Sequence, residues 1–518
     1  MSSNEKQEKE KLIKQSTDEM AAFCKRKGFV FQNSEIYGSY AGFFDYGPLG
    51  AELNNNIKQL LWKEFVQKRD DVVGIDGTII THPIVWKASG HADHFGDAML
   101  DCEKCKQRFR GDHLIKDTLK IETDGMSLSQ IDEIVEQNKI NCPSCSGKLG
   151  KAQVFNLMFT TQVGPVANKE SISYLRPETA QVIFADYKHV YDTGRVKLPF
   201  GIAQIGKAFR NEISPRNFLF RCREFQQCEI EFFIHPKKTN DCPYFDEIKD
   251  MEIQINTAKC QVEKAPHITT TFDALVSEGI IKSKWHAYWL SQFYNWFLNL
   301  GVRKENLRFR EHLKDELAHY AAACFDIEYK YPFGWQEIHG MADRSTFDLT
   351  QHQTFSKKSM EIFDEETGEK VLGHVIEPSQ GIERAFLTFM FDAYTHEPEN
   401  KERDWIVLKL HPKLAPYKVA ILPLVKKDGL SDIALDIHKD MKEDFTSYYD
   451  ASAAIGRRYA RQDEVGTPYC ITVDYETKEK NDVTIRDRDS TKQIRIPIKN
   501  LKDTIRKLIK GEVKFEEL

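Results

Sequence analysis

The sequence lacks the features that mark a membrane protein or an exported one. None of its apolar runs approaches the roughly 20 residues that a membrane-spanning helix needs. The first fifteen residues, MSSNEKQEKEKLIKQ, are charged and contain no apolar core, so they do not match a secretory signal, and their acidic residues argue against a transit peptide. We therefore expect a cytoplasmic protein with no membrane role, in which residues 1–15 form a flexible tail.

An excess of positive charge is also missing. The 73 lysines and arginines stand against 79 aspartates and glutamates, which gives a net charge of −6. Such a chain has no global attraction to nucleic acid, so any RNA contact must use local patches. Hydrophobic residues at 41% and charged residues at 29% are typical of a globular protein. Because 518 residues exceed the usual limit of one hydrophobic core, we expect two or three domains.

The eleven cysteines are an odd number in a chain without an export signal, which favours free thiols over a disulfide framework. Four of them form two CxxC pairs, CEKC at Cys102 and Cys105 and CPSC at Cys142 and Cys145. Four thiolates at this spacing can close a tetrahedral zinc site, and we favour zinc over the alternative of four free thiols. The composition shift at about 101–150 predicts an inserted module, with a helix over residues 127–138. The other seven cysteines have no metal-binding spacing and read as small hydrophobic residues.

Hydrophobic periodicity predicts the main elements outside this module. Apolar residues at steps of four predict a helix over 50–70, whereas alternation predicts a strand over 74–86, interrupted at Pro83. The aromatic-rich stretch 288–300 reads as a core helix, and 382–394 as another helix. The charged stretch 397–403 reads as a linker, and a new domain of alternating strands and helices is predicted from about residue 410.

Residues 197–234 have the pattern that most clearly indicates a functional site. In GIAQIGKAFRNEI, the strand period of two places Arg210 and Glu212 opposite the apolar Ile205 and Phe209. SPRNFL supplies a turn, after which FRCREFQQCEIEFFI alternates again and sets one charged face against an apolar one. The charged residues of this second strand are Arg221, Arg223, Glu229 and Glu231. The pattern predicts a hairpin with a charged face.

A charged hairpin face of this kind suits a nucleoside triphosphate. Guanidinium groups bind phosphate oxygens bidentately, and a carboxylate beside them can accept a hydrogen bond from an adenine amine or help to hold Mg²⁺. The alternative is a solvated sheet face with surface ion pairs, and the spacing alone leaves both interpretations open.

Two longer motifs decide between these interpretations by resemblance. FRNE with RCREFQQCEIEFF resembles motif 2 of class II aminoacyl-tRNA synthetases, and EPSQGIERAF at 377–386 resembles motif 3. RPETAQ at 176–181, together with FVFQNSEIYG and YGPLG near the N-terminus, is similar to the homodimeric type of glycyl-tRNA synthetase. The resemblance runs from about residue 28 to the C-terminal domain.

The resemblance implies an α+β fold with an antiparallel catalytic sheet of six or seven strands, flanked by helices. It implies a catalytic domain over 16–405 with the insertion at about 101–150, and an α/β anticodon-binding domain over 410–518. The segment 75–91 resembles motif 1 and implies a homodimer. The expected activity is the two-step charging of tRNA(Gly) with glycine, through glycyl-adenylate.

The resemblance also assigns residues to ATP and to Mg²⁺. Arg210, at the α-phosphate, and Arg384, at the γ-phosphate, are the expected catalytic residues, acting by charge neutralisation and positioning. The full set of expected ATP contacts is Arg210, Asn211, Glu212, Arg221, Cys222, Phe225, Glu337, Ile338, Gly381 and Arg384. Of these, Glu337 matches the position that the family associates with the metal.

For glycine, the resemblance assigns the ammonium to Glu178, Glu229 and Glu377, and places Ser379 close to the α-carbon. Arg110, in FRGD, is a further candidate contact. Carboxylates give charge-assisted hydrogen bonds to an ammonium, and a filled pocket excludes larger amino acids. The zinc is expected to be structural, because some family members lack the cysteines. Lone histidines such as His91 and His339 are assigned no role.

Two rival functions remain from the sequence. A threonyl, prolyl or seryl synthetase would share motifs 2 and 3, but RPETAQ and EPS disfavour it. A synthetase-like nucleic-acid-binding protein without catalysis would be expected to have lost Arg210, Arg221 and Arg384, all of which are present. In the C-terminal domain, the basic residues Arg457, Arg458 and Arg461 and the stretch 485–496 fit either RNA binding or a solvated charged face.

Overall fold

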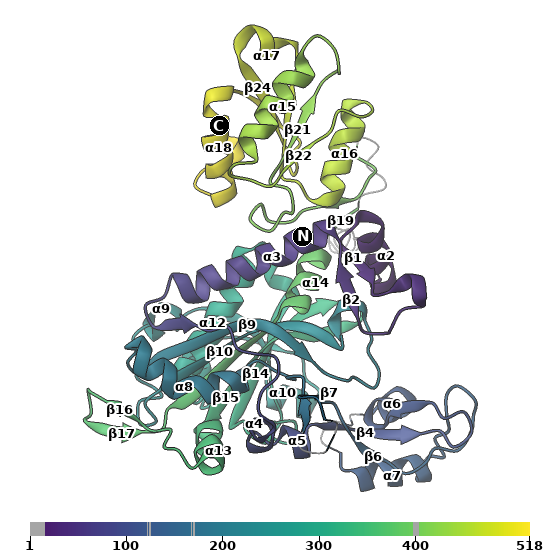
Figure 1. Ribbon diagram of the computed structural model, residues 1–518, viewed down its shortest axis with the longest axis vertical. Helices are drawn as coiled ribbons and strands as arrows, with labels where there is room; N and C mark the ends of the chain where they lie inside the picture. Colours follow the sequence, from purple (N-terminus) through teal and green to yellow (C-terminus); the bar gives the residue numbers. More distant parts are fainter. Residues whose placement is uncertain (1–15, 122, 124–125, 167, 169–170, 397–402) are drawn as a thin grey trace.

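The computed structural model describes residues 16–518 except 122, 124–125, 167, 169–170 and 397–402. The expected tail at 1–15 and nearly all of the expected linker at 397–403 lie outside the described residues. Among the described helices, none combines the length and the apolar character needed to cross a membrane. Figure 1 shows a large body with a smaller unit stacked at one end and a module projecting from the other.

A nine-stranded sheet forms the centre of the large body. In spatial order its strands are β12 (Ile268–Thr271), β11 (Glu252–Asn256), β13 (Leu307–Glu311), β14 (Ala323–Tyr331), β15 (Gly334–Ser345), β18 (His374–Gly381), β10 (Glu224–Ile234), β9 (Phe200–Phe209) and β3 (Val72–Gly74). The six strands from β13 to β9 pair antiparallel throughout, while β11 and β3 each add a parallel pairing at the flanks. The expected antiparallel catalytic sheet is confirmed, with more strands than the six or seven expected.

The hairpin of β9 and β10 has the alternation that its sequence predicts. Its register runs from Phe209 opposite Glu224 to Phe200 opposite Phe233. On β10, Ile230 and Phe232 pack into the main core on one face of the sheet, whereas Phe233 packs into a second core on the other face. Because Glu229 and Glu231 share the period of Phe233, they lie on that second face.

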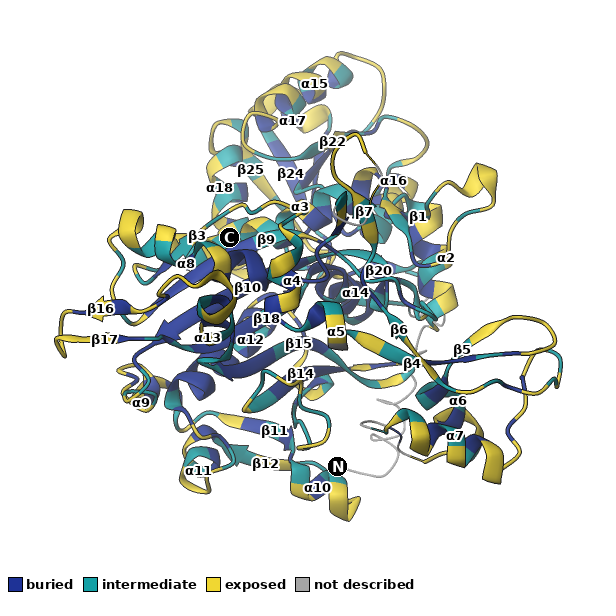
Figure 2. Cartoon of the chain, turned by 60° about the horizontal axis from the view of Figure 1, so that its bottom comes forward, coloured by how far each residue is buried: buried dark blue, intermediate teal, exposed yellow. Residues whose placement is uncertain are grey.

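Helices cover both faces of the sheet and bury its apolar residues. The main core is shared with α2 (Thr17–Lys27), α3 (Pro48–Trp62, continued by a π-helical segment, Lys63–Gln67), α12 (Lys284–Asn299) and α14 (Ile382–Ala393). The second core is shared with α8 (Ala180–Gly194) and α13 (Phe347–Ser356). Figure 2 shows that β10, β15 and β18 are buried over most of their length. The helices expected at 50–70, 288–300 and 382–394 are thus confirmed.

The strand expected over 74–86 is wrong. β3 ends at Gly74, and Pro83 begins a helix, α4 (Pro83–Ala88), whose N-cap is His82. Proline is favoured at a first helical position because it has no N–H to leave unpaired. The intervening loop is held by side chains: the Gly77 N–H donates to Gln204 at 2.6 Å, and Arg176 donates to the Gly77 carbonyl at 2.9 Å.

The remaining short elements of the large body lie at its edges and in its connections. They are β1 (Val30–Gln32), β2 (Phe44–Tyr46), α5 (His91–His94), β7 (Thr160–Gln162), β8 (Ile172–Tyr174), α9 (Phe245–Ile248), α10 (Ala258–Glu263), α11 (Phe272–Ser277), β16 (Ile362–Asp364), β17 (Glu369–Val371), β19 (Tyr394–Thr395) and β20 (Val407–Leu408), with 3-10 turns at Glu35–Tyr37, Phe218–Phe220 and Lys304–Asn306.

The cysteine-bearing module has a small core of its own. It contains a three-stranded sheet of β5 (Arg108–Arg110), β4 (Gly96–Asp101) and β6 (Gln153–Asn156), packed with α6 (Gly111–Leu119) and α7 (Leu128–Gln137). The helix expected at 127–138 is α7, whose N-cap Ser127 forms a capping box with Gln130.

The C-terminal unit is built around a five-stranded, partly parallel sheet with a separate core. The strand order is β22 (Ser447–Tyr449), β21 (Val419–Pro423), β23 (Tyr469–Val473), β24 (Asp482–Asp487) and β25 (Gln493–Pro497); the helices are α15 (Leu430–Met441), α16 (Ile455–Val465), α17 (Tyr475–Lys480) and α18 (Ile498–Lys510), with a 3-10 turn at Phe515–Glu517. The preceding residues Leu410 and Leu414 belong instead to the main core of the large body. The expected α/β fold of this unit is confirmed.

Candidate active site

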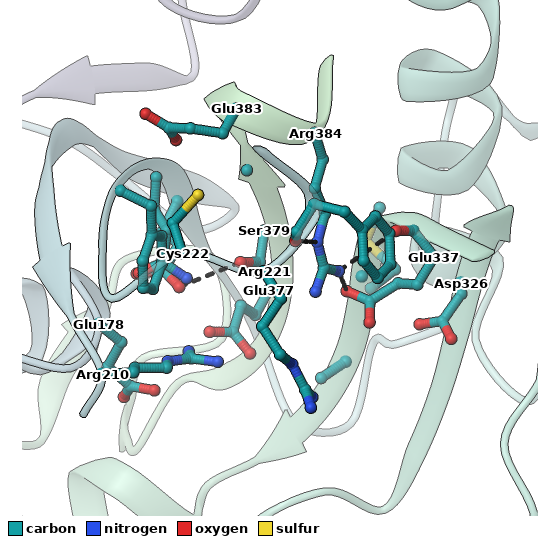
Figure 3. Close-up of a pocket in the computed structure, with 18 of the residues that line it drawn as sticks. Glu178, Arg210, Arg221, Cys222, Asp326, Glu337, Glu377, Ser379, Glu383 and Arg384 are labelled. Atoms are coloured by element: carbon teal, nitrogen blue, oxygen red, sulfur yellow. Dashed lines mark hydrogen bonds and ion pairs between the residues drawn. The ribbon is translucent and has the colours of Figure 1, made fainter. Parts of the chain in front are cut away.

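A cavity of about 320 Å³ lies over the middle strands of the large sheet. Its walls come from β10, β14, β15, β18, the start of α14 and the loop between β9 and β10. Figure 3 shows carboxylates and guanidinium groups from these elements converging on one space. Twelve of the residues expected at the ATP and glycine sites line it: Glu178, Arg210, Glu212, Arg221, Cys222, Phe225, Glu229, Glu337, Glu377, Ser379, Gly381 and Arg384.

The hairpin supplies one wall of the cavity. Arg210 follows the end of β9, and its Nε donates to the Pro177 carbonyl at 3.0 Å, while its guanidinium lies 5.3 Å from the Phe225 ring centroid. In the loop, Arg221 Nε lies 3.6 Å from Glu212 Oε2. Both arginines are only partly buried, so each is anchored at one edge and can still meet an anion in the cavity.

The opposite wall is anchored by α14. Gly381 is the N-cap of this helix, and Arg384 lies in its first turn. The Arg384 guanidinium lies 4.7 Å from the Phe220 ring centroid, and its Nη1 lies 2.7 Å from Glu337 Oε1. Aromatic rings and fixed guanidinium groups that line one cavity can hold a purine base and its phosphates.

The floor of the cavity is acidic and almost closed to solvent. Glu178, Glu229 and Glu377 are exposed by 5%, 2% and 5%. Sheet register brings Glu229 opposite Ser379, whose Oγ donates to Glu229 Oε1 at 3.1 Å. The other oxygen of Glu229 accepts from the Thr179 backbone N–H at 2.7 Å and from the Thr179 hydroxyl. These bonds fix the carboxylate while leaving it next to the cavity.

One buried cation balances part of this negative charge. Arg344 is fully buried, donates from Nη1 to Glu377 at 2.9 Å and from Nε to Asp348 at 2.7 Å. Burial nevertheless raises the pKa of Glu377 to about 8, against the effect of Arg344 and with further repulsion from Glu229. Burial and the neighbouring Glu178 also raise the pKa of Glu229. The floor therefore contains more carboxylates than cations, and a positively charged ligand group is the natural complement.

Glu178 has a different environment from its neighbours. His91 Nε2 lies 3.2 Å from Glu178 Oε2, and the Gln181 amide donates to Oε1 at 3.0 Å. Burial acts to raise the pKa of Glu178, but His91 and then Arg344 outweigh it and hold the pKa below its ordinary value. Glu178 is therefore ionised at neutral pH.

Known proteins resemble the chain over nearly its whole length. A model of the "tRNA synthetase class II core domain (G, H, P, S and T)" matches residues 159–394, and one of the "Anticodon binding domain" matches residues 418–508. The glycine–tRNA ligase of Treponema denticola is 44% identical over 501 residues, which are 96% of this chain and 98% of the relative. That of Caldanaerobacter subterraneus is 44% identical over 97% of this chain and all of the relative. The chain belongs to the glycine–tRNA ligase family.

Three residues expected at the substrates do not line the cavity. The Ile338 side chain is buried in the main core, and its carbonyl accepts from Gln380 at 2.9 Å. The Asn211 backbone N–H donates to the Leu157 carbonyl at 2.7 Å. Arg110 is held in the module by Asp97, at 2.9 Å, and by Asp112, at 2.7 Å. The contacts with ATP expected of Ile338 and Asn211, and the contact with glycine expected of Arg110, stay predictions.

Several residues of the site escaped sequence reasoning. Arg344 and His91 contact the acidic floor, although they lie far along the chain from Glu178 and outside the motifs quoted for glycine. None of the motifs quoted above contains Arg344, whereas His91 ends the segment 75–91 that resembles motif 1. His312 and Asp326 line the far side of the cavity, and no sequence pattern singled them out.

The two CxxC pairs meet in the module. Cys102 Sγ lies 3.5 Å from Cys145 Sγ, and Cys105 Sγ lies 3.6 Å from Cys142 Sγ. Thiolates of a tetrahedral zinc site with Zn–S bonds of about 2.3 Å lie about 3.8 Å apart, so this arrangement fits such an ion with little movement. The Cys105 backbone N–H, at 3.4 Å, lowers the pKa of the Cys102 thiol to about 6, which favours the thiolate that a metal needs.

In the C-terminal unit, the basic residues differ in their exposure to solvent. Arg457 and Arg461 are exposed, but Arg458 is buried and donates to the Pro423 carbonyl at 2.6 Å. Arg486 is also buried and pairs with Asp463 at 2.9 Å. The expectation that Arg458 forms part of an exposed basic face is wrong, because it holds the backbone of the unit together.

Proposed function

We propose that the protein is a glycine–tRNA ligase that activates glycine with ATP and transfers the glycyl group to the 3′ end of tRNA(Gly). The observation that carries this function is the buried acidic floor of Glu178, Glu229 and Glu377, next to arginine-lined walls in a single cavity. An amino acid offers an ammonium to the floor and a carboxylate to the arginines, where the nucleotide phosphates also bind. Family membership supports the same reaction.

For the first step, we assign ATP to the upper walls. Phe225 and Phe220, each beside an arginine, offer ring faces on which the adenine ring can stack. Arg210 neutralises the α-phosphate while the glycine carboxylate attacks it, and Arg384 takes the γ-phosphate of the leaving pyrophosphate. Glu337 offers a carboxylate ligand to the Mg²⁺ that accompanies ATP, and this ion neutralises phosphate charge when bound. No covalent enzyme intermediate is required.

Selection of glycine follows from the size and charge of the floor. Glu178 and Glu229 accept hydrogen bonds from the ammonium, and the positive charge of the bound ammonium favours the ionised form of Glu377, whose oxygens remain bound to Arg344. Ser379, fixed on Glu229, occupies the space that the side chain of a larger amino acid would need. Arg110, Asn211 and Ile338 have at most a supporting role in this proposal, because they do not line the cavity.

The remaining parts of the proposal concern assembly and partners. The residues at 410–518 recognise tRNA(Gly) as an anticodon-binding domain, the chain forms a homodimer through the motif 1 region, and charging takes place in the cytoplasm. The four cysteines Cys102, Cys105, Cys142 and Cys145 hold a structural zinc ion, for which their convergent sulfur atoms are the support.

ATP–pyrophosphate exchange, measured separately with each amino acid, tests the central proposal. Glycine should support exchange, and threonine, proline, serine and alanine should not. Exchange that is absent with glycine, or stronger with another amino acid, would refute the assignment of the substrate. An Arg210→Ala variant serves as the inactive control.

A truncation tests whether glycine activation and tRNA recognition belong to different domains. Because Leu410 and Leu414 pack in the main core, the chain should be cut after Pro416 rather than at residue 410. The truncated chain should retain glycine-dependent exchange but lose most tRNA charging. If a folded truncation lost both activities equally, the proposed boundary would be wrong.

A further inference from the structure

Three potential metal ligands come together on the side of the cavity away from the hairpin. Cys324 and Asp326 are two residues apart on β14, so their side chains share one face of the strand. His312 follows β13, and its backbone N–H donates to the Cys324 carbonyl at 3.0 Å, which continues the pairing of these strands. All three residues line the cavity.

The distances among the three side chains are close to those of a coordination site. His312 Nε2 lies 2.7 Å from Asp326 Oδ2, and one donor atom of each residue, Cys324 included, falls within a 4.8 Å group. Ligand atoms around a tetrahedral zinc ion lie about 3.3 to 3.8 Å apart, so small side-chain rotations would suffice. Gly340, opposite Asp326 in the sheet, has no side chain to fill this space.

The donor types select a class of ion. One imidazole nitrogen, one thiol sulfur and one carboxylate oxygen suit Zn²⁺ and similar borderline ions, whereas Mg²⁺ prefers oxygen alone. A cluster in which His312 is hydrogen-bonded to both Asp326 and the Cys324 thiol is the alternative arrangement of the same three groups, and a bound ion distinguishes the two.

We propose that His312, Cys324 and Asp326 form a second metal site, which binds a borderline divalent ion such as Zn²⁺ and leaves one coordination position open to the cavity. It is separate from the four-cysteine cluster of the module and from the Mg²⁺ that accompanies ATP. Three protein ligands with a fourth position facing a cavity are typical of a zinc site that can take an external oxygen ligand.

Cobalt titration of the full-length protein tests this site without relying on enzymatic activity. Co²⁺ bound to a thiolate gives a charge-transfer absorption, and the bound metal can be counted by elemental analysis. The titration is done in excess Mg²⁺ on the wild type and on a cluster-free variant, in which Cys102, Cys105, Cys142 and Cys145 are all replaced by alanine so that no three of them can still hold a metal. Cys324→Ala is then added to the cluster-free variant, or Cys260→Ala as a control thiol on α10, outside the cavity.

The wild type should bind two ions, and the cluster-free variant should bind one, with a weaker thiolate band because one thiolate replaces four. Addition of Cys324→Ala should abolish that band, whereas Cys260→Ala should leave it. An Asp326→Asn change in the cluster-free variant should weaken cobalt binding about tenfold or more. The proposal is overturned if the cluster-free variant binds no cobalt through a thiolate, or if the band survives Cys324→Ala. Because none of the four replaced cysteines lines the cavity, the titration of the cluster-free variant decides the matter even if Cys324→Ala fails to fold.

Discussion

The sharpest test of the acidic floor is the replacement of Glu229 by glutamine. The glutamine side chain has the same shape and can keep the local hydrogen bonds. Its carbonyl can accept from the Thr179 backbone N–H, and its amide can donate to the Ser379 hydroxyl, which can rotate to accept. The change therefore removes the negative charge with little change in structure.

We expect Glu229→Gln to lower kcat/KM for glycine. Loss of one charged partner from a buried, hydrogen-bonded charge pair costs about 2–5 kcal/mol. At about 1.4 kcal/mol per factor of ten, a loss of about 3 kcal/mol lowers kcat/KM for glycine by about 100-fold or more. The KM for ATP should change little, because the adenine and phosphate contacts lie on the other walls of the cavity.

Glycine-dependent ATP–pyrophosphate exchange at varied glycine and ATP measures both constants. Glu224→Gln is the matched control: it is the same substitution on the same strand, but Glu224 is partly exposed and pairs with Lys207 at the surface. A surface ion pair contributes about 1 kcal/mol or less, so this control should stay within a few-fold of wild type. If Glu229→Gln kept its kcat/KM for glycine within threefold, or raised the KM for ATP equally, the floor would not be the ammonium site.

Three further outcomes are expected. Ser379→Gly should raise alanine-dependent exchange relative to glycine-dependent exchange, because it empties the space assigned to exclusion; unchanged discrimination would contradict that role. Burial raises the pKa of Glu383 to about 7, so its stabilising contribution is full below pH 4.5 and is lost as the pH rises through 7. Glu383→Gln should therefore gain thermal stability relative to wild type between pH 5 and pH 8, and a constant difference in melting temperature would refute this. Cys105→Ala or a zinc chelator should speed amide exchange in α7 but not in α12, and equal protection with and without metal would argue against a structural zinc.

The alternation of side chains in the hairpin could be predicted from the sequence because it depends only on residues that are neighbours in the chain. A period of two, interrupted by one turn, determines which side chains face the core and which face the other side, and the register of β9 and β10 follows from it. The same reasoning failed at residues 75–82, where alternation also occurs. There the Ile75 N–H still donates to the Ala203 carbonyl of β9, but the N–H and carbonyl of Gly77 bond to the side chains of Gln204 and Arg176, and a pattern of hydrophobicity contains no information about such partners.

The joint burial of the acidic floor is the feature that the sequence motifs could not predict. Motif resemblance could name Glu178, Glu229 and Glu377, yet the property that makes them a site is their burial together around one fully buried arginine. Arg344 satisfies Glu377 and Asp348 and comes no closer than 3.9 Å to Glu178, so the carboxylates nearest the cavity retain unbalanced charge. Uncompensated charge is costly in a closed space. A substrate ammonium removes that cost on binding, which gives the floor a preference for an amino acid that the separate motifs do not explain.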